Sequence, residues 1–169
     1  RAISKKNSRD TFVDENFNSV FGTGNALQND LTISGGNENS NYFFSLGHLD
    51  QDGVIKNASY ERTNARLNYE AKLNDKITLS SRMSYTYTKS NRIQQSSNVS
   101  GMMLGLLRTP PDFDGRDYKG TYYSSSGVEY INRGRSYRKS IGQSVNQSYT
   151  NPLWTINEQE SSTRVNRVT

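Results

Sequence analysis

Two long stretches of this chain alternate apolar and polar residues with a period of two. They run from Glu61 to Leu73 and from Ile77 to Lys89, separated by Asn74-Asp75-Lys76. Such alternation puts apolar side chains on one face of a β-strand and polar side chains on the other. Each stretch is about twice the usual strand length of about 5 to 6 residues. At about 3.3 Å per residue, each is long enough to cross a bilayer at the tilt found in membrane barrels. The pattern predicts a long antiparallel hairpin.

The two faces of this hairpin differ in polarity along their whole length. We assign the apolar face to lipid, with Leu67, Tyr69, Leu73, Leu79, Met83 and Tyr85. We assign the polar face to a wet barrel lumen, with Arg62, Asn64, Arg66, Asn68 and Arg82. The lumen charges could attract an anionic substrate or pair with a plug inside the barrel. The plainer interpretation is a solvated interior, which tolerates charge freely.

Shorter alternating stretches precede this hairpin and extend it to a meander of four strands over residues 28–90. Residues 28–34 and 42–49 are predicted strands, joined by a Gly- and Asn-rich turn at 35–39. Membrane barrels keep periplasmic turns short and extracellular loops long. We therefore expect the turns at 35–39 and 74–76 to be periplasmic and the opposite ends to be extracellular.

The rest of the chain lacks sustained alternation. Residues 1–27 are interpreted as an extracellular loop segment with local packing, and residues 91–163 as one long extracellular loop. Within that loop, 99–108 has an apolar stripe, possible capping residues before it and Pro110-Pro111 after it, so a short helix is predicted there. Residues 164–169 are expected to begin a fifth strand.

Composition agrees with a membrane β-barrel better than with a soluble core. The 169 residues are 31% hydrophobic, and the mean hydropathy is −0.89, which is low for a soluble domain of this size. Eleven tyrosines and six phenylalanines argue against disorder. A barrel needs apolar residues at only every second strand position. The predicted fold is therefore all-β, an antiparallel transmembrane β-barrel fragment. Because the chain starts without methionine or signal peptide, we expect an internal piece of a larger protein.

The sequence gives little sign of catalytic, metal or nucleic-acid chemistry. The net charge of +5 is spread along strands and loops, and there is no cysteine. Asp112, Asp114 and Asp117 lack the spacing of a calcium loop. His48 is the single histidine, with no recognisable catalytic motif around it. We expect no enzyme activity, cofactor, bound metal or nucleic-acid partner.

Several ordered motifs resemble one family, the SusC-like TonB-dependent transporters of the Bacteroidota outer membrane. The motifs are Leu31-Thr32-Ile33-Ser34-Gly35-Gly36-Asn37, Tyr42-Phe43-Phe44-Ser45-Leu46-Gly47 with Asp52-Gly53-Val54-Ile55, Tyr60-Glu61-Arg62-Thr63-Asn64-Ala65-Arg66-Leu67-Asn68, and Asn151-Pro152-Leu153-Trp154. The resemblance implies a barrel of about 22 strands, an N-terminal plug, energy supplied through TonB, and a SusD-like lipoprotein lid. It also implies an outer-membrane location and uptake of oligosaccharides or peptides.

Aromatic residues of the long loop are the candidates for contact with the substrate or the lid. They are Tyr118, Tyr122, Tyr123, Tyr130 and Trp154. Aromatic rings offer rigid contact area with a polar handle, which suits sugar rings and peptide side chains. We favour packing within the loop, or contact with the lid, over stacking on the substrate, because aromatic residues also dominate protein interfaces. The alternative for the whole chain is a soluble β-sandwich or adhesin module that binds carbohydrate through these tyrosines.

Overall fold

The computed structural model describes residues 11–138 and 149–169, which divide into two compact units. The first unit, the sheet unit, contains residues 23–53, 58–92 and 162–169. The second, the helical unit, contains the described residues of 11–22, 54–57 and 93–161. Residues 1–10 of the predicted N-terminal loop and 139–148 of the predicted long loop lie outside the described residues.

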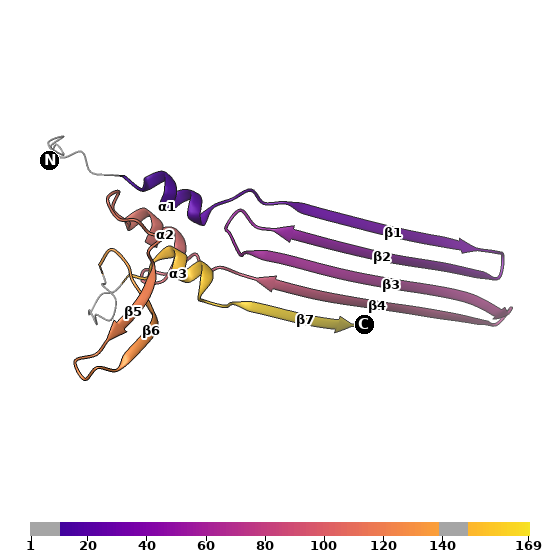
Figure 1. Ribbon diagram of the computed structural model, residues 1–169. Coiled ribbons are helices and arrows are strands. Elements are labelled where there is room, and N and C mark those ends of the chain that lie inside the picture. The colour runs from indigo at the N-terminus through magenta and orange to yellow at the C-terminus, as the bar shows by residue number, and fades with distance from the viewer. Residues whose placement is uncertain (1–10, 139–148) are drawn as a thin grey trace. The chain divides into compact units, whose positions relative to one another are not determined.

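The sheet unit is a single antiparallel sheet of five strands, in the order β1-β2-β3-β4-β7 (Figure 1). The strands are β1 (Ala26–Gly36), β2 (Ser40–Asp52), β3 (Ser59–Asn74), β4 (Ile77–Asn91) and β7 (Ser162–Val168). The predicted all-β antiparallel fold is confirmed, and the sheet is consistent with a piece of a barrel wall.

The strands extend beyond the ranges that alternation predicted. β1 has 11 residues and β2 has 13, whereas the apolar alternation covered only 28–34 and 42–49. The fifth strand begins at Ser162, two residues before the predicted start. Backbone hydrogen bonds continue the ladder past the last apolar side chain, because they do not depend on side-chain polarity.

Asparagine side chains close the two short turns of the sheet. The Asn37 carboxamide oxygen accepts hydrogen bonds from the backbone N–H groups of Asn39 and Ser40, at 2.9 and 2.8 Å. The Asn74 carboxamide oxygen accepts one from the Lys76 N–H at 2.9 Å. Such bonds replace a backbone partner in a tight turn, which is why asparagine favours these positions.

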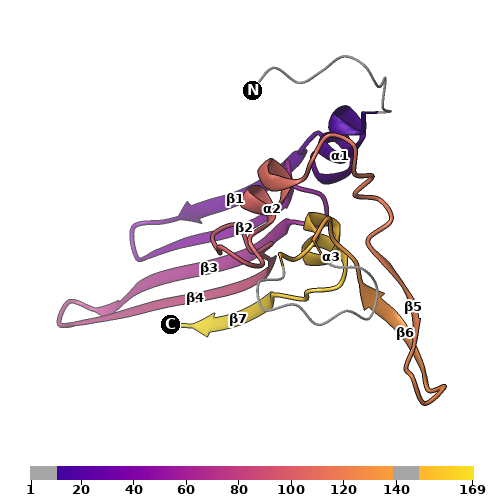
Figure 2. The ribbon, with the colours of Figure 1, turned by 90° about the vertical axis from the view of Figure 1, so that its left-hand side faces the viewer.

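The helical unit contains three short helices and a two-stranded hairpin (Figure 2). The helices are α1 (Val13–Val20), α2 (Met102–Arg108) and α3 (Pro152–Asn157), and the hairpin strands are β5 (Lys119–Tyr123) and β6 (Glu129–Gly134). α3 packs against both other helices. The buried apolar side chains of this unit are Val20, Ile55, Ile93, Met102, Leu153 and Ile156. No helix within residues 11–138 and 149–169 is long and apolar enough to span a membrane.

Three expectations for these segments need correction. The N-terminal segment that was interpreted as a loop contains α1, and the long loop that lacked alternation contains the β5–β6 hairpin. The predicted helix 99–108 starts only at Met102. The Ser97 hydroxyl instead accepts hydrogen bonds from the N–H groups of Val99 and Ser100, which holds those residues in a turn.

Candidate functional site

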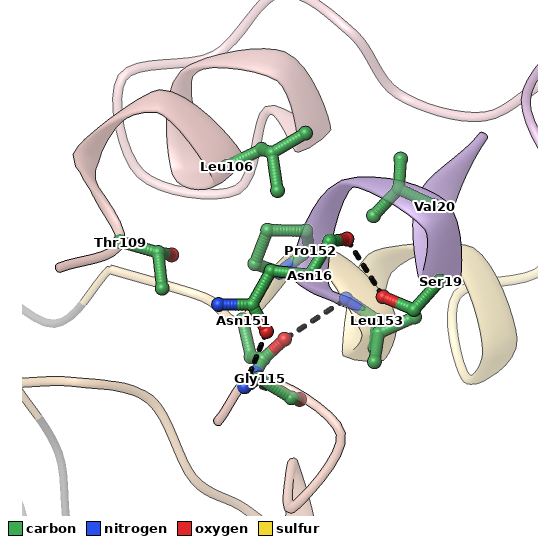
Figure 3. A pocket seen from close by; sticks show the side chains of 9 residues that line it. All are labelled: Asn16, Ser19, Val20, Leu106, Thr109, Gly115, Asn151, Pro152 and Leu153. Carbon is green, nitrogen blue, oxygen red and sulfur yellow. Dashed lines mark hydrogen bonds between the residues drawn. The ribbon is translucent and has the colours of Figure 1, made fainter. Parts of the chain in front are cut away.

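Two asparagines from distant parts of the chain hold the backbone of Gly115 (Figure 3). The Gly115 N–H donates to the Asn16 carboxamide oxygen at 2.7 Å, and the Asn16 amide donates to the Phe113 carbonyl at 2.8 Å. The Asn151 amide donates to the Gly115 carbonyl at 2.9 Å, while its oxygen caps α3 by accepting from the Leu153 N–H at 2.9 Å. Both asparagines are buried, and each donates and accepts a hydrogen bond within the helical unit, so they organise the fold of this unit.

The cavity beside Asn16, Asn151 and Gly115 is too small to be a ligand site. Its volume is about 10 Å³, which is room for about one water molecule. It lies between α1, α2, α3 and the Gly115 loop, and Asn16, Ser19, Val20, Leu106, Thr109, Gly115, Asn151, Pro152 and Leu153 line it (Figure 3). This cavity therefore holds no substrate-sized ligand.

The end of α3 anchors the base of the β5–β6 hairpin. The Trp154 ring lies over Gly134, where a Cβ would come within 3.3 Å of the indole. Glu158 accepts hydrogen bonds from the Lys119 ammonium at 2.6 Å and from the Tyr118 hydroxyl at 3.1 Å. The hydrogen bond raises the pKa of Lys119 and lowers the pKa of Glu158. Trp154 and Tyr118, both predicted to contact substrate or lid, thus have a packing role in this structure.

The remaining predicted tyrosines lie on the hairpin itself. Tyr122 and Tyr130 are cross-strand partners whose ring centres are 6.0 Å apart, and the Arg133 guanidinium lies 5.0 Å from the Tyr130 ring centre. Tyr123 is on the opposite face, 63% exposed, and its hydroxyl donates to Glu129 at 2.8 Å. That hydrogen bond raises the pKa of Tyr123. The structure therefore brings Tyr122 and Tyr130 together and separates Tyr123 from them.

Arginines of the helical unit fall into two groups. Arg116 pairs with Asp114 at 2.8 Å, and Arg135 pairs with Asp117. The hydrogen bond from Arg116 lowers the pKa of Asp114. Other arginines lie over tyrosine rings instead, among them Arg108, whose guanidinium is 4.7 Å from the Tyr149 ring centre. Arg108 also lies in the last turn of α2, where a cation interacts favourably with the helix dipole.

The strand register groups the residues that were predicted to face lipid into continuous rows. Leu67 pairs with Phe44 on one side and Met83 on the other. Directly opposed residues of an antiparallel pair point to the same face. The row continues to Ile33 in β1, and a second row joins Leu31, Leu46, Ala65, Tyr85 and Val168. At one end, Tyr42 lies over Gly35, where a Cβ would be 2.6 Å from the tyrosine hydroxyl.

The residues that were predicted to face the lumen share the other face. Asn68 pairs with Arg82, Arg66 with Ser84, and Arg62 with Leu49 and Thr88. Asn64 flanks Gly47, and a Cβ at Gly47 would come within 2.6 Å of Asp30 and 2.8 Å of Asn64.

Neither chemical candidate from the sequence forms a metal site among the described residues. His48 is within hydrogen-bonding distance of the Thr63 hydroxyl, at 3.0 Å. Residues 11–138 and 149–169 hold no group of three or more metal-ligating side chains.

Comparison with known proteins points to one family of receptors. The chain is 34% identical over 121 residues to TonB-dependent receptor P39 of Formosa agariphila, which covers 68% of this chain. It is 29% identical over 115 residues to TonB-dependent receptor P26 of the same organism, which covers 67% of this chain. The matched region spans only 12% and 11% of the lengths of these relatives. No family model matches the chain. The similarity supports a relationship to the TonB-dependent receptors over about two thirds of the chain.

Proposed function

We propose that this chain forms part of the barrel wall of a TonB-dependent importer in the outer membrane. The observation that carries the proposal is the apolar face shared by successive strands of the sheet. Leu31, Leu67 and Met83 on this face are 52%, 42% and 55% exposed. Apolar rows of this extent are unfavourable in water, but they are what a lipid-facing surface requires.

The height of the apolar face supports the same function. It extends along β3 from Leu73 to Thr63, which pairs with Tyr87 in β4. Ten residue steps correspond to about 33 Å along a strand. At a strand tilt of about 40°, this becomes about 25 Å along the membrane normal, the height of the apolar band of outer-membrane barrels. Tyr85 and Tyr87 lie near one end of the band, where barrels carry aromatic girdles.

The rival function, a soluble carbohydrate-binding β-sandwich or adhesin, fits the strands less well. Sandwich sheets bury their apolar faces against one another and use strands of ordinary length. β1 to β4 have 11, 13, 16 and 15 residues. The other sheet among the described residues is a hairpin with strands of 5 and 6 residues.

We also propose a transporter type, a substrate class and partners for this importer. The importer belongs to the SusC-like type, takes up an oligosaccharide or peptide, and works with a SusD-like lipoprotein. TonB engages a part of the protein beyond this chain. The helical unit, with its exposed tyrosines, contributes to substrate capture or lid contact. The chain has a structural and binding role and performs no catalysis.

Cysteine scanning of the full-length gene product in native membranes tests the barrel assignment. The chain contains no cysteine, so single substitutions in a background without other cysteines report one position at a time. We expect Leu67→Cys and Tyr69→Cys to resist a membrane-impermeant maleimide, and Arg66→Cys and Asn68→Cys to react with it through the lumen. Reactivity without a two-residue period from 63 to 73 contradicts the proposal.

A further inference from the structure

Two arginines converge on one tyrosine ring in the helical unit. The guanidinium carbon of Arg108 is 4.7 Å from the Tyr149 ring centre, and that of Arg138 is 5.1 Å from the same centre. Arg138 also lies 5.5 Å from the ring centre of Tyr137. The two rings are parallel within 5°, with centres 6.1 Å apart. Two positive charges therefore share one aromatic platform.

The two arginines of this platform differ from three other cations of the unit in their partners. Asp114, Asp117 and Glu158 pair with Arg116, Arg135 and Lys119. Within residues 11–138 and 149–169, by contrast, no ion pair joins Arg108 or Arg138 to a carboxylate. Both guanidinium groups contact one ring, so they lie within about 10 Å of each other, about one Debye length at physiological ionic strength.

The contacts with tyrosine leave hydrogen-bond donors free. A guanidinium group has five N–H donors in its plane, and an aromatic ring takes up its face rather than its edge. Arg108 uses one donor on the Asn98 carbonyl at 2.8 Å, which fixes its position. Among residues 11–138 and 149–169, the other donors of these arginines make no hydrogen bond, and they have the planar geometry that matches carboxylate and similar oxyanions.

Structural contacts explain the place of each arginine but not the pairing of two like charges. Cation–π contacts with Tyr137 and Tyr149 hold Arg138. Arg108 lies in the last turn of α2, where a cation interacts favourably with the helix dipole. Arg138 belongs to no helix, yet it reaches the same ring and adds a like charge. A bound anion would account for both arginines at once.

We propose that Arg108 and Arg138, on the platform of Tyr149 and Tyr137, form an oxyanion-binding site for a carboxylate or sulfate group carried by a sugar ring. The edges of the guanidinium groups bind the anionic group, and the half-buried ring of Tyr137, which contacts a single arginine among the described residues, supplies contact area for the sugar. This inference rests on the proposed role of the helical unit in substrate capture, and it narrows the substrate to an acidic saccharide.

Equilibrium binding to the full-length protein in detergent tests the site. The probes are tri-galacturonate for carboxylate, 6-sulfated galactotriose for sulfate, and unmodified galactotriose as the neutral reference. We expect at least one charged probe to bind more tightly than the neutral one. Arg138→Gln and Arg108→Gln should each weaken that binding by about tenfold or more, since hydrogen bonds to charged groups are among the stronger ones. Whichever charged probe responds identifies the anionic group.

The controls separate loss of the site from loss of the fold. Arg116→Gln removes an arginine that is already paired with Asp114, so it should leave binding within about twofold. Arg138→Lys keeps the positive charge but lacks the planar, bidentate hydrogen-bonding geometry of a guanidinium, so it should retain part of the affinity for the charged probe. Equal binding of neutral and charged probes, equal loss in Arg116→Gln and Arg138→Gln, or no binding of either charged probe would overturn the inference. If the binding experiment fails in one of these ways but the cysteine scan still shows maleimide reactivity with a period of two, the anion site is refuted and the barrel assignment is retained.

Discussion

Leu67→Arg is the most direct perturbation of the proposed lipid face. Leu67 lies in the apolar row between Phe44 and Met83. It is six residues from Leu73 and four from Thr63, or about 20 and 13 Å from the two ends of the band along the strand. An arginine there would sit near the bilayer midplane, where a positive charge costs about 2 to 4 kcal/mol in barrel proteins. That cost lowers the equilibrium constant for folding by about 30- to 900-fold.

Asn68→Arg is the matched control, because it adds the same side chain at the same depth on the opposite face. Asn68 pairs with Arg82, so the new charge meets a like charge across the strands. Such a pair costs at most about 1 kcal/mol. The assay is refolding of the full-length protein from urea into lipid vesicles, followed by the heat-dependent mobility shift of the folded barrel in gels. If Asn68→Arg lowered the fraction of refolded barrel as much as Leu67→Arg, or more, the two faces would have been assigned wrongly.

Three further outcomes test the packing of each unit. Gly47→Val should lower the free energy of unfolding by about 1 to 3 kcal/mol, measured from the urea midpoint, because its side chain would overlap neighbouring side-chain oxygens on the polar face. Asn151→Ala removes both the α3 cap and a bond to a loop carbonyl, so it should cost about 2 kcal/mol and speed limited proteolysis of the helical unit. The pKa of Glu158 is lowered by Lys119, so their favourable interaction is present above the ordinary carboxylate pKa and is lost as the pH falls through the folded value. Acid should therefore loosen the hairpin and shift Trp154 fluorescence, whereas Glu158→Gln should abolish that pH dependence.

The long strands could be predicted from sequence because period-two alternation is a local property. The hairpin predicted over 61–89 is β3–β4, and the register pairs Leu67 with Met83 on one face. The helix near 99–108 was predicted from its apolar stripe, but its start was not, because the extended backbone of Gly101, with a ψ of 126°, separates the turn capped by Ser97 from the helix.

The helical unit shows where local patterns are insufficient. The β5–β6 hairpin is short, and a register shift between Gly120 and Tyr122 interrupts its pairing, so it has no extended alternation to detect. Trp154 was a candidate both for packing and for binding from its type, and in the structure its ring lies over Gly134. Tyr123, by contrast, remains exposed. Side-chain type alone does not distinguish an aromatic residue that packs internally from one that stays on the surface.

The sequence by itself determined where the sheet strands lie, the polarity of each face and the class of sheet, since these follow from the order of neighbouring residues along one strand; it did not determine the full length of β1 and β2. Tertiary structure alone decided which distant side chains meet. Asn16 and Asn151 hold Gly115 from positions 99 and 36 residues away in sequence. Arg108 and Arg138 reach the same ring from different segments. Such contacts depend on chain folding that closes long loops, and no local period encodes which loops close together.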